Sequence, residues 1–157
     1  MSTSNSQAAD LIPVVRFRLG DNQYALLVDD VVEVAAMVAV SPATDALPEV
    51  LGLVNRRGEP LPLLDLRLVF KQPASPLTDE TLFIVVQSGD QLAGFVLDEI
   101  YQVDYIQAEQ FKPMAAAGPY IRSIISHEAG LIQVINPTPI FEAFLTGTMN
   151  TNIEAGR

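Results

Sequence analysis

Two parts of the sequence resemble each other in a way that indicates an internal duplication. Residues 20–34 (GDNQYALLVDDVVEV) align without a gap with residues 89–103 (GDQLAGFVLDEIYQV), at an offset of 69 positions. Residues 53–70 align in the same order with residues 124–141, at an offset of 71 positions. This self-similarity predicts two related units that share a core, because one unit of this size would bury little apolar surface alone. The alternative is coincidence, since Gly-Asp turns between valines are common.

The repeated stretches have the pattern of short β-strands. Residues 14–19 alternate apolar and cationic side chains, which is the period of a strand with one solvated face. Further apolar runs are rich in Val, Leu and Ile, and 11 Pro and 9 Gly divide the chain into short segments. We therefore expect an all-β fold with roughly four or five short strands in each repeat. Residues 35–40 fit a further strand, residues 48–51 at most one helical turn, and the proline-bearing residues 72–79 a linker.

The last part of the chain predicts a short helix. Thr138 and Pro139 fit a capped helix start, apolar residues follow at helical spacing, and Gly147 is expected to end the helix. We expect this helix to cover an open edge of the second unit. The polar residues 1–12 and 147–157 are expected to be tails around a single domain at residues 13–146.

The composition excludes several classes of partner. The net charge is −10, which argues against nucleic acid or anionic lipid as the main partner, because both are bound by clustered cations. No apolar run approaches the roughly 20 residues of a membrane helix, so we expect a soluble protein with no direct membrane insertion. The absence of Cys removes disulfides and thiolate chemistry and fits a cytoplasmic location.

The residues that could support catalysis or ligand chemistry are few. His127 is the single histidine, and its neighbour Glu128 would have to be its partner in an enzyme. A turn histidine without catalytic role is the favoured interpretation. The sequence shows no metal-ligand spacing and no glycine-rich phosphate loop, so no cofactor, metal site or catalytic residue is predicted. The acidic doublets at residues 29–30 and 98–99 are expected to cap turns. By elimination, function should depend on protein-binding surfaces.

A basic hairpin is the most distinctive local feature. Within residues 52–70 (GLVNRRGEPLPLLDLRLVF), two apolar runs flank a polar turn, where Gly58 can adopt a positive φ and Asn55 can bond to nearby backbone. Arg56, Arg57 and Arg67 add positive charge to this stretch. The aligned residues 124–141 of the second repeat lack these arginines, so building such a hairpin does not require them.

The same stretch resembles the signature of the CheW-like domain of bacterial chemotaxis. In that family an apolar strand ends in Gly-Val-Ile-Asn-x-Arg-Gly and continues as Val-x-Pro-Val-x-Asp-Leu-Arg. This sequence supplies the matching residues at Gly52, Asn55, Arg57, Gly58, Pro62, Asp65, Leu66 and Arg67.

The resemblance extends over roughly residues 13–145 and implies a fold. That fold has two five-stranded, SH3-like β-barrel subdomains that share a hydrophobic core, with a short C-terminal helix. It agrees with the duplication found independently in the sequence.

The resemblance also implies a function. It is that of a non-enzymatic adaptor that couples chemoreceptors to the histidine kinase CheA, in the cytoplasm and recruited to membrane-associated receptor arrays. The implied partners are the CheW-like regulatory domain of that kinase and the cytoplasmic tips of the receptors.

Carried over residue by residue, the resemblance implies a receptor-binding set. The apolar members would line a groove for a receptor helix, the glycines would allow close backbone approach, and Arg57 would bind carboxylate or carbonyl groups. Alternatively, Arg57 pairs only with Glu33 at the surface, and the valines belong to the core. The set comprises Val31, Glu33, Gly52, Asn55, Arg57, Gly58, Ile100 and Val103.

Two positions depart from the family pattern. Arg56 stands where the family motif usually has an apolar residue, and it is expected to add an exposed cation to the hairpin. In the second repeat, the counterpart of Asp-Leu-Arg is Asn136, Pro137 and Thr138.

Alternatives to the chemotaxis adaptor remain at this stage. The same adaptor could serve a non-flagellar chemosensory system for surface motility or development. From other classes, the chain could be a double β-barrel that binds a small apolar ligand, or an enzyme that uses His127 and Glu128.

Overall fold

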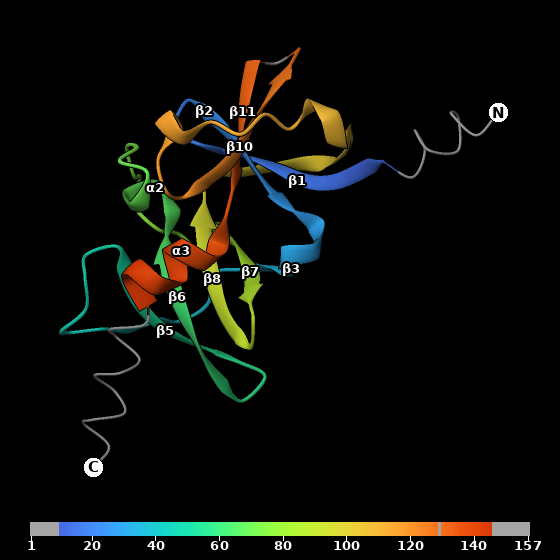
Figure 1. Ribbon diagram of the computed structural model, residues 1–157. Coiled ribbons are helices and arrows are strands. Elements are labelled where there is room, and N and C mark those ends of the chain that lie inside the picture. The colour runs from blue at the N-terminus through green and yellow to red at the C-terminus, as the bar shows by residue number, and fades with distance from the viewer. Residues whose placement is uncertain (1–9, 129, 146–157) are drawn as a thin grey trace.

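The computed structural model describes residues 10–128 and 130–145, which form two β-sheets and several short helices (Figure 1). Sheet A has five strands in the order β10-β11-β2-β1-β9, and sheet B has six in the order β3-β7-β8-β6-β5-β4. The strands of sheet A are β1 (Leu11–Leu19), β2 (Asn22–Leu27), β9 (Glu99–Gln107), β10 (Ile121–His127) and β11 (Gly130–Ile135). Those of sheet B are β3 (Val31–Ala36), β4 (Ser41–Pro42), β5 (Val50–Arg56), β6 (Glu59–Asp65), β7 (Leu82–Ser88) and β8 (Gln91–Leu97).

The helices are all short. None in the described residues has the length and apolar character needed to cross a membrane. Together with the two sheets, they give the mainly β fold with a short C-terminal helix that the sequence predicts. The helices are η1 (Val28–Asp30), α2 (Leu66–Val69), η2 (Ala108–Gln110), η3 (Ala115–Ala117), α3 (Pro137–Ile140) and η4 (Phe141–Leu145).

Elements of the structure recur at the spacings of the two sequence alignments. Shifted by 71 positions, β5 falls onto β10 and α2 falls onto α3 with identical bounds, and β6 falls onto β11 to within one residue. Shifted by 69 positions, β2 falls onto β8 with the same start. The two sheets then have the same strand order, since β10-β11-β2-β1-β9 corresponds to β5-β6-β8-β7-β3.

The two repeats do not each build one sheet. Sheet A combines β1 and β2 of the first repeat with β9, β10 and β11 of the second. Sheet B combines β3 to β6 of the first repeat with β7 and β8 of the second. The chain crosses from sheet A to sheet B at η1 and returns at Asp98, between β8 and β9. The linker at residues 72–79 therefore separates the sequence repeats but lies within the stretch that forms sheet B. The crossing points are equivalent positions of the repeat, so the repeats exchange their first hairpins.

Within residues 10–128 and 130–145, three apolar clusters hold this arrangement together. The largest joins both sheets, with Phe17 and Leu26 from sheet A packed with Leu64 and Phe95 from sheet B. Sheet A has a second cluster that includes Ile132, and sheet B has a third cluster formed by its own side chains. The predicted common core is thus the first cluster, and each sheet also covers a core of its own.

Several local predictions need correction. Residues 48–51 do not form a helical turn, since Val50 begins β5 and pairs with β6. The predicted strand at residues 35–40 ends at Ala36. The second arm of the basic hairpin ends at Asp65, whose side chain accepts a hydrogen bond from the Arg67 amide and so starts α2. A capping carboxylate and the following apolar residues favour a turn of helix here over continued strand.

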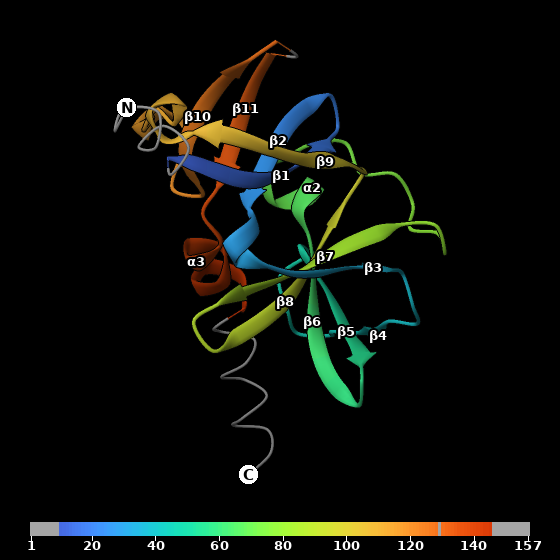
Figure 2. The same cartoon turned by 90° about the vertical axis from the view of Figure 1, so that its right-hand side faces the viewer.

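The C-terminal helix begins two residues earlier than predicted. Asn136, rather than Thr138, is the N-cap, and Pro137 occupies the first helical position. The helix contacts β7 and inserts Ile140 and Phe141 into the shared cluster, so it packs between the sheets as well as against the strand (Figure 2). The predicted end at Gly147 and most of both tails lie outside the described residues. Sheet A already begins at Leu11, which pairs with Gln107.

Candidate functional site

The hairpin between β5 and β6 turns over two residues. Arg56 pairs with Glu59, and the intervening Arg57 and Gly58 have φ values of 53° and 85°. Two consecutive residues with positive φ are typical of the tight turn whose twist matches that of the flanking strands. The Asn55 Oδ1 accepts a hydrogen bond of 2.8 Å from the Gly58 amide, as the sequence suggested. The turn therefore presents the Arg57 side chain at the tip of a well-defined hairpin.

Glu33 accepts hydrogen bonds from both arginines of this hairpin. The Arg56 Nε donates to Glu33 Oε2, and the Arg57 Nη2 donates to Glu33 Oε1 at 3.0 Å. The side chains of Arg56 and Glu33 are 21% and 28% exposed, whereas that of Arg57 is 73% exposed. The prediction that Arg56 is the exposed cation is wrong, because Arg56 is drawn onto Glu33 and Arg57 remains in solvent.

The ion pairs of Glu33 also connect strands from opposite edges of sheet B. Glu33 lies on β3 at one edge of the sheet, and Arg56 lies on β5 near the other edge, with β7, β8 and β6 between them in the strand order. The sheet must curl for these side chains to meet. The ion pairs therefore bridge the open ends of sheet B.

Gly52 has a local structural reason to be glycine. It is buried with a φ of 143°, and a Cβ built on it would lie 2.1 Å from the carbonyl oxygen of Ser41 in β4. The close backbone approach at Gly52 is thus made by the chain's own β4. No contact with a partner is required to explain this residue.

The apolar members of the predicted set divide between the sheets. Val31 lies at the start of β3 and Ile100 near the start of β9, and both are half-buried against the shared cluster. Val103 lies further along β9, and its side chain is 45% exposed. The structure joins Glu33 to Arg57 and Asn55 to Gly58 by hydrogen bonds, while Ile100 and Val103 belong to the other sheet.

Val34 and Arg67 have positions or environments that were not predicted from the sequence. Val34 is the repeat counterpart of Val103 and is similarly exposed. The repeat alignment therefore contained the signal for it. Arg67 was recognised as part of the motif but not as a buried residue, and its side chain is only 3% exposed. Its side chain forms ion pairs with both Asp65 and Asp98.

His127 occupies a different environment from the one its neighbour Glu128 suggested. It is half-buried at the end of β10, at the position that corresponds to Arg56 in the first repeat. Burial alone would raise the pKa of Asp104, but hydrogen bonds from Arg16 and Gln102, with the charges of Arg16 and His127, lower that pKa below its usual value. Of these effects on Asp104, the charge of His127 is the smallest.

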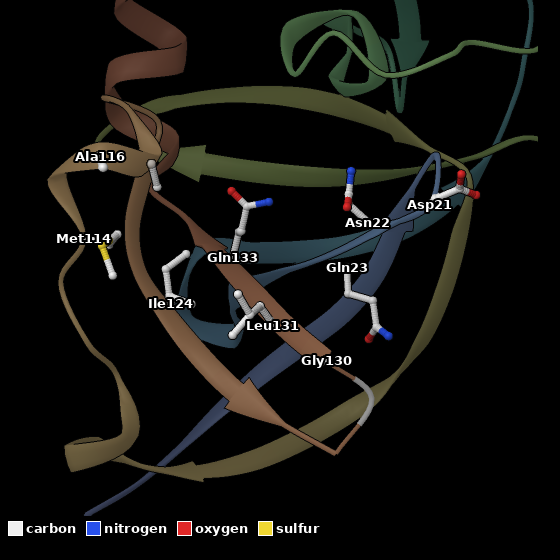
Figure 3. A pocket seen from close by; sticks show the side chains of 10 residues that line it. Asp21, Asn22, Gln23, Met114, Ala116, Ile124, Gly130, Leu131 and Gln133 are labelled. Carbon is white, nitrogen blue, oxygen red and sulfur yellow. The ribbon is translucent and has the colours of Figure 1, made fainter.

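One cavity of about 630 Å³ lies beside sheet A (Figure 3). It is bounded by β2, β11 and the loop that carries η3. Met114, Ile124 and Leu131 supply apolar surface, and Gln23 and Gln133 supply amide groups. This cavity does not include any member of the predicted receptor-binding set.

Comparisons with known proteins agree with the sequence resemblance. The model of the family described as the CheW-like domain matches residues 13–144. A chemotaxis protein CheW from Helicobacter pylori is 29% identical over 67% of this chain and 64% of its own length. A chemotaxis protein CheW from Klebsiella aerogenes is 30% identical over 62% of this chain and 58% of its own. The matched regions thus span less than two thirds of these two relatives.

A solved structure supports the fold independently. The scaffolding protein TtCheW from Thermoanaerobacter tengcongensis superposes with a TM-score of 0.74 and 23% sequence identity. The superposition covers 80% of this chain and 89% of that protein. The overall fold of this chain is therefore also found in a crystal structure.

Proposed function

The chain belongs to the CheW-like domain family, and on that premise we propose that it is a non-enzymatic adaptor coupling chemoreceptors to the histidine kinase CheA. The observation that carries this proposal is the family match over residues 13–144. Two relatives that match over more than half of the chain are named as chemotaxis proteins, which supports the pathway. The adaptor would work in the cytoplasm and join membrane-associated arrays by binding receptors, without inserting into the membrane itself.

We place the receptor contact along the junction of the two sheets and the basic hairpin. Arg57 is the member best suited to bind a partner, because most of its side chain is in solvent and Arg56 can hold Glu33 without it. An arginine already positioned by one hydrogen bond loses less side-chain entropy when it binds a carboxylate. Val103 supplies exposed apolar surface for a receptor helix, while Val31 and Ile100 support it from the core. Asn55 and Gly58 determine the shape of the turn, and the lack of a side chain at Gly52 allows the backbone of β4 to pack closely against β5.

The proposal is tested by reversing the charge of Arg57. Arg57→Glu should keep the fold but reduce co-purification with the receptors of the same organism, because the exposed cation is replaced by an anion. Lys112→Glu is the matched control, since it makes the same charge change at an exposed position in the loop before η3. Binding to the kinase is measured in parallel for both variants. Unchanged receptor binding by Arg57→Glu would show that Arg57 is not part of the site. If Arg57→Glu binds both the receptor and the kinase as the parent does, the proposed location of the receptor site is contradicted.

The cavity beside sheet A supports a second candidate function. Its apolar wall and two amides are suitable for a small ligand with apolar and hydrogen-bonding parts. A ligand that binds only the folded state raises the unfolding temperature, so a thermal-shift screen against metabolites tests this function directly. A stabilising metabolite whose effect is lost in Leu131→Glu would favour a ligand-binding protein.

A further inference from the structure

A buried arginine joins the two sheets at the second crossing of the chain. Arg67 in α2 forms a two-point contact with Asp65, with Nε to Oδ1 at 2.9 Å and Nη2 to Oδ2 at 3.0 Å. Its Nη1 donates to Asp98 Oδ1 and to the Ser75 hydroxyl, both at 3.2 Å. The side chains of Arg67, Asp65 and Asp98 are all mostly or fully buried. We call Asp65, Arg67 and Asp98 the clasp.

The clasp reaches sheet A through Asp98. The other carboxylate oxygen of Asp98 accepts a hydrogen bond of 2.7 Å from the Gly20 amide, in the turn between β1 and β2. The Asp98 amide donates to the Arg18 carbonyl at 3.1 Å. Asp98 is also the residue at which the chain passes from β8 in sheet B to β9 in sheet A. One carboxylate thus ties the turn of sheet A to an arginine that is fixed on sheet B.

The equivalent crossing has a weaker and more exposed connection. The repeat places Asn136, Thr138 and Asp29 where the clasp has Asp65, Arg67 and Asp98, so the central cation is replaced by a neutral hydroxyl. There, the Thr138 hydroxyl bonds with that of Ser88, and the partly exposed Arg122 donates from Nη2 to Asp30 Oδ2 at 3.3 Å and to Asn136 Oδ1 at 3.5 Å, in place of the buried Arg67. Exposed pairs restrain geometry weakly, whereas a buried arginine bound at fixed angles to two carboxylates restrains it strongly. The junction is therefore fixed on one side and looser on the other.

We propose that Arg67 is a positioning residue that sets the angle between the sheets and so the placement of β9 for receptor binding. This inference rests on the proposed adaptor function. Ile100 and Val103 follow Asp98 directly on β9, and the hairpin with Arg57 belongs to sheet B. A receptor helix that contacts both must meet them at a fixed separation, which the shared apolar cluster alone does not specify, because apolar contacts are non-directional. The clasp supplies the directional bonds.

The test measures inter-sheet geometry apart from binding. The chain contains no Cys, so Leu53→Cys on sheet B and Leu131→Cys on sheet A allow two spin labels to be placed at defined sites. The distance distribution between the labels is compared for the labelled parent, Arg67→Lys and Asp98→Asn. Lysine keeps the charge but loses the two-point contact, and asparagine keeps an acceptor for Gly20 but loses the charge that holds Arg67. Ile132→Val, which removes a methyl group within the sheet A cluster, is the control for a general loss of stability.

The expected result is a broader or shifted distribution for both clasp variants and an unchanged one for Ile132→Val. Receptor affinity should fall roughly 3- to 30-fold with the clasp variants, in proportion to the broadening. If Arg67→Lys does not fold, Asp98→Asn alone decides the question. An unchanged distribution, or a broadened one with full receptor affinity, would overturn the inference. A parent protein with a narrow distribution but no receptor binding would contradict the adaptor function, and the distance measurement would still report on the clasp.

Discussion

At the level of single residues, Glu33 bonds to two neighbouring arginines with different surroundings. Arg56 is mostly shielded from solvent and links β5 to β3 across the ends of sheet B, whereas Arg57 sits at the hairpin tip. A partly buried ion pair contributes more to folding than an exposed one, because solvent screens it less. The two arginines are adjacent in sequence but should therefore have separate effects.

This difference predicts the outcome of two single substitutions. Arg57→Gln should change the free energy of unfolding by less than about 0.5 kcal/mol, because its pair with Glu33 is exposed. Arg56→Gln should cost about 1 kcal/mol, because it removes the shielded bond that connects β3 and β5. Urea denaturation of both variants measures these values. Equal losses, or a larger loss for Arg57→Gln, would contradict the assignment of Arg56 as the structural partner.

Asp104 predicts a pH-dependent contribution to stability. Its pKa is lowered in the folded protein, where Arg16 donates to it at 2.9 Å, so its charge stabilises the folded state. A carboxylate with a lowered pKa stabilises fully above its ordinary pKa, and this contribution is lost as the pH falls through the folded-state value. Asp104→Asn should therefore destabilise by about 1 to 2 kcal/mol near neutral pH.

The difference between Asp104→Asn and the parent should decrease as the pH is lowered. It should stay constant above the ordinary pKa range of an aspartate and shrink as the pH falls below that range, because the lowered pKa keeps the parent carboxylate charged until then. Denaturation of both proteins in parallel over this range gives the difference directly. A difference that is independent of pH would show that the hydrogen-bond geometry, and not the charge, accounts for the effect.

At the level of elements, the β5–β6 hairpin contains two glycines required for different reasons. At Gly52 a side chain would collide with the Ser41 carbonyl of β4, whereas a Cβ at Gly58 would meet nothing within 4 Å. Both have positive φ. Gly52→Ala should thus cost more than about 2 kcal/mol and displace β4, since it combines strain with a backbone collision. Gly58→Ala should cost about 1 kcal/mol from φ alone. Equal losses on denaturation would show that β4 moves aside freely.

The elements that could be predicted from sequence were those with a strong local signal. The β5–β6 hairpin has turn residues with an evident backbone role, and the repeat alignment placed its counterpart β10–β11 correctly. The start of α2 at Asp65 was missed because apolar residues continue past it, and only the capping bond to the Arg67 amide ends the strand. The pairing of Glu33 with Arg56 was missed for another reason. It depends on how far sheet B curls, and no local pattern in the sequence records that curvature.

At the level of the whole molecule, the exchange of hairpins between repeats makes each sheet depend on both halves of the chain. The parallel pairs β6–β8 and β11–β2 each join a strand of one repeat to a strand of the other. The sequence shows the repeats but not this exchange, because aligned repeats would look the same if each folded on its own. Only the strand order of the sheets distinguishes the two arrangements.

The exchange predicts that the sequence repeats do not fold separately. A fragment of residues 10–76 contains β1, β2 and β6 but lacks their partner strands β9, β11 and β8. Strands of both sheets would therefore have unpaired edges in this fragment. The fragment of residues 77–145 contains β9, β11 and β8 but lacks β1, β2 and β6. Each fragment alone should therefore lack a cooperative unfolding transition, because neither can complete an apolar cluster that spans two sheets. Refolding the two together should restore the transition.

The matched control is the full chain cut after folding, at a protease site placed within residues 72–79. This stretch has no regular secondary structure, and the paired strands should hold the two pieces together after cleavage. The cut protein should keep the circular dichroism spectrum and the unfolding transition of the parent, at a lower midpoint because the chain connection is lost. A separate fragment that unfolds cooperatively by itself would mean that a repeat can close its own sheet. In that case the exchange of hairpins would be one of two accessible arrangements.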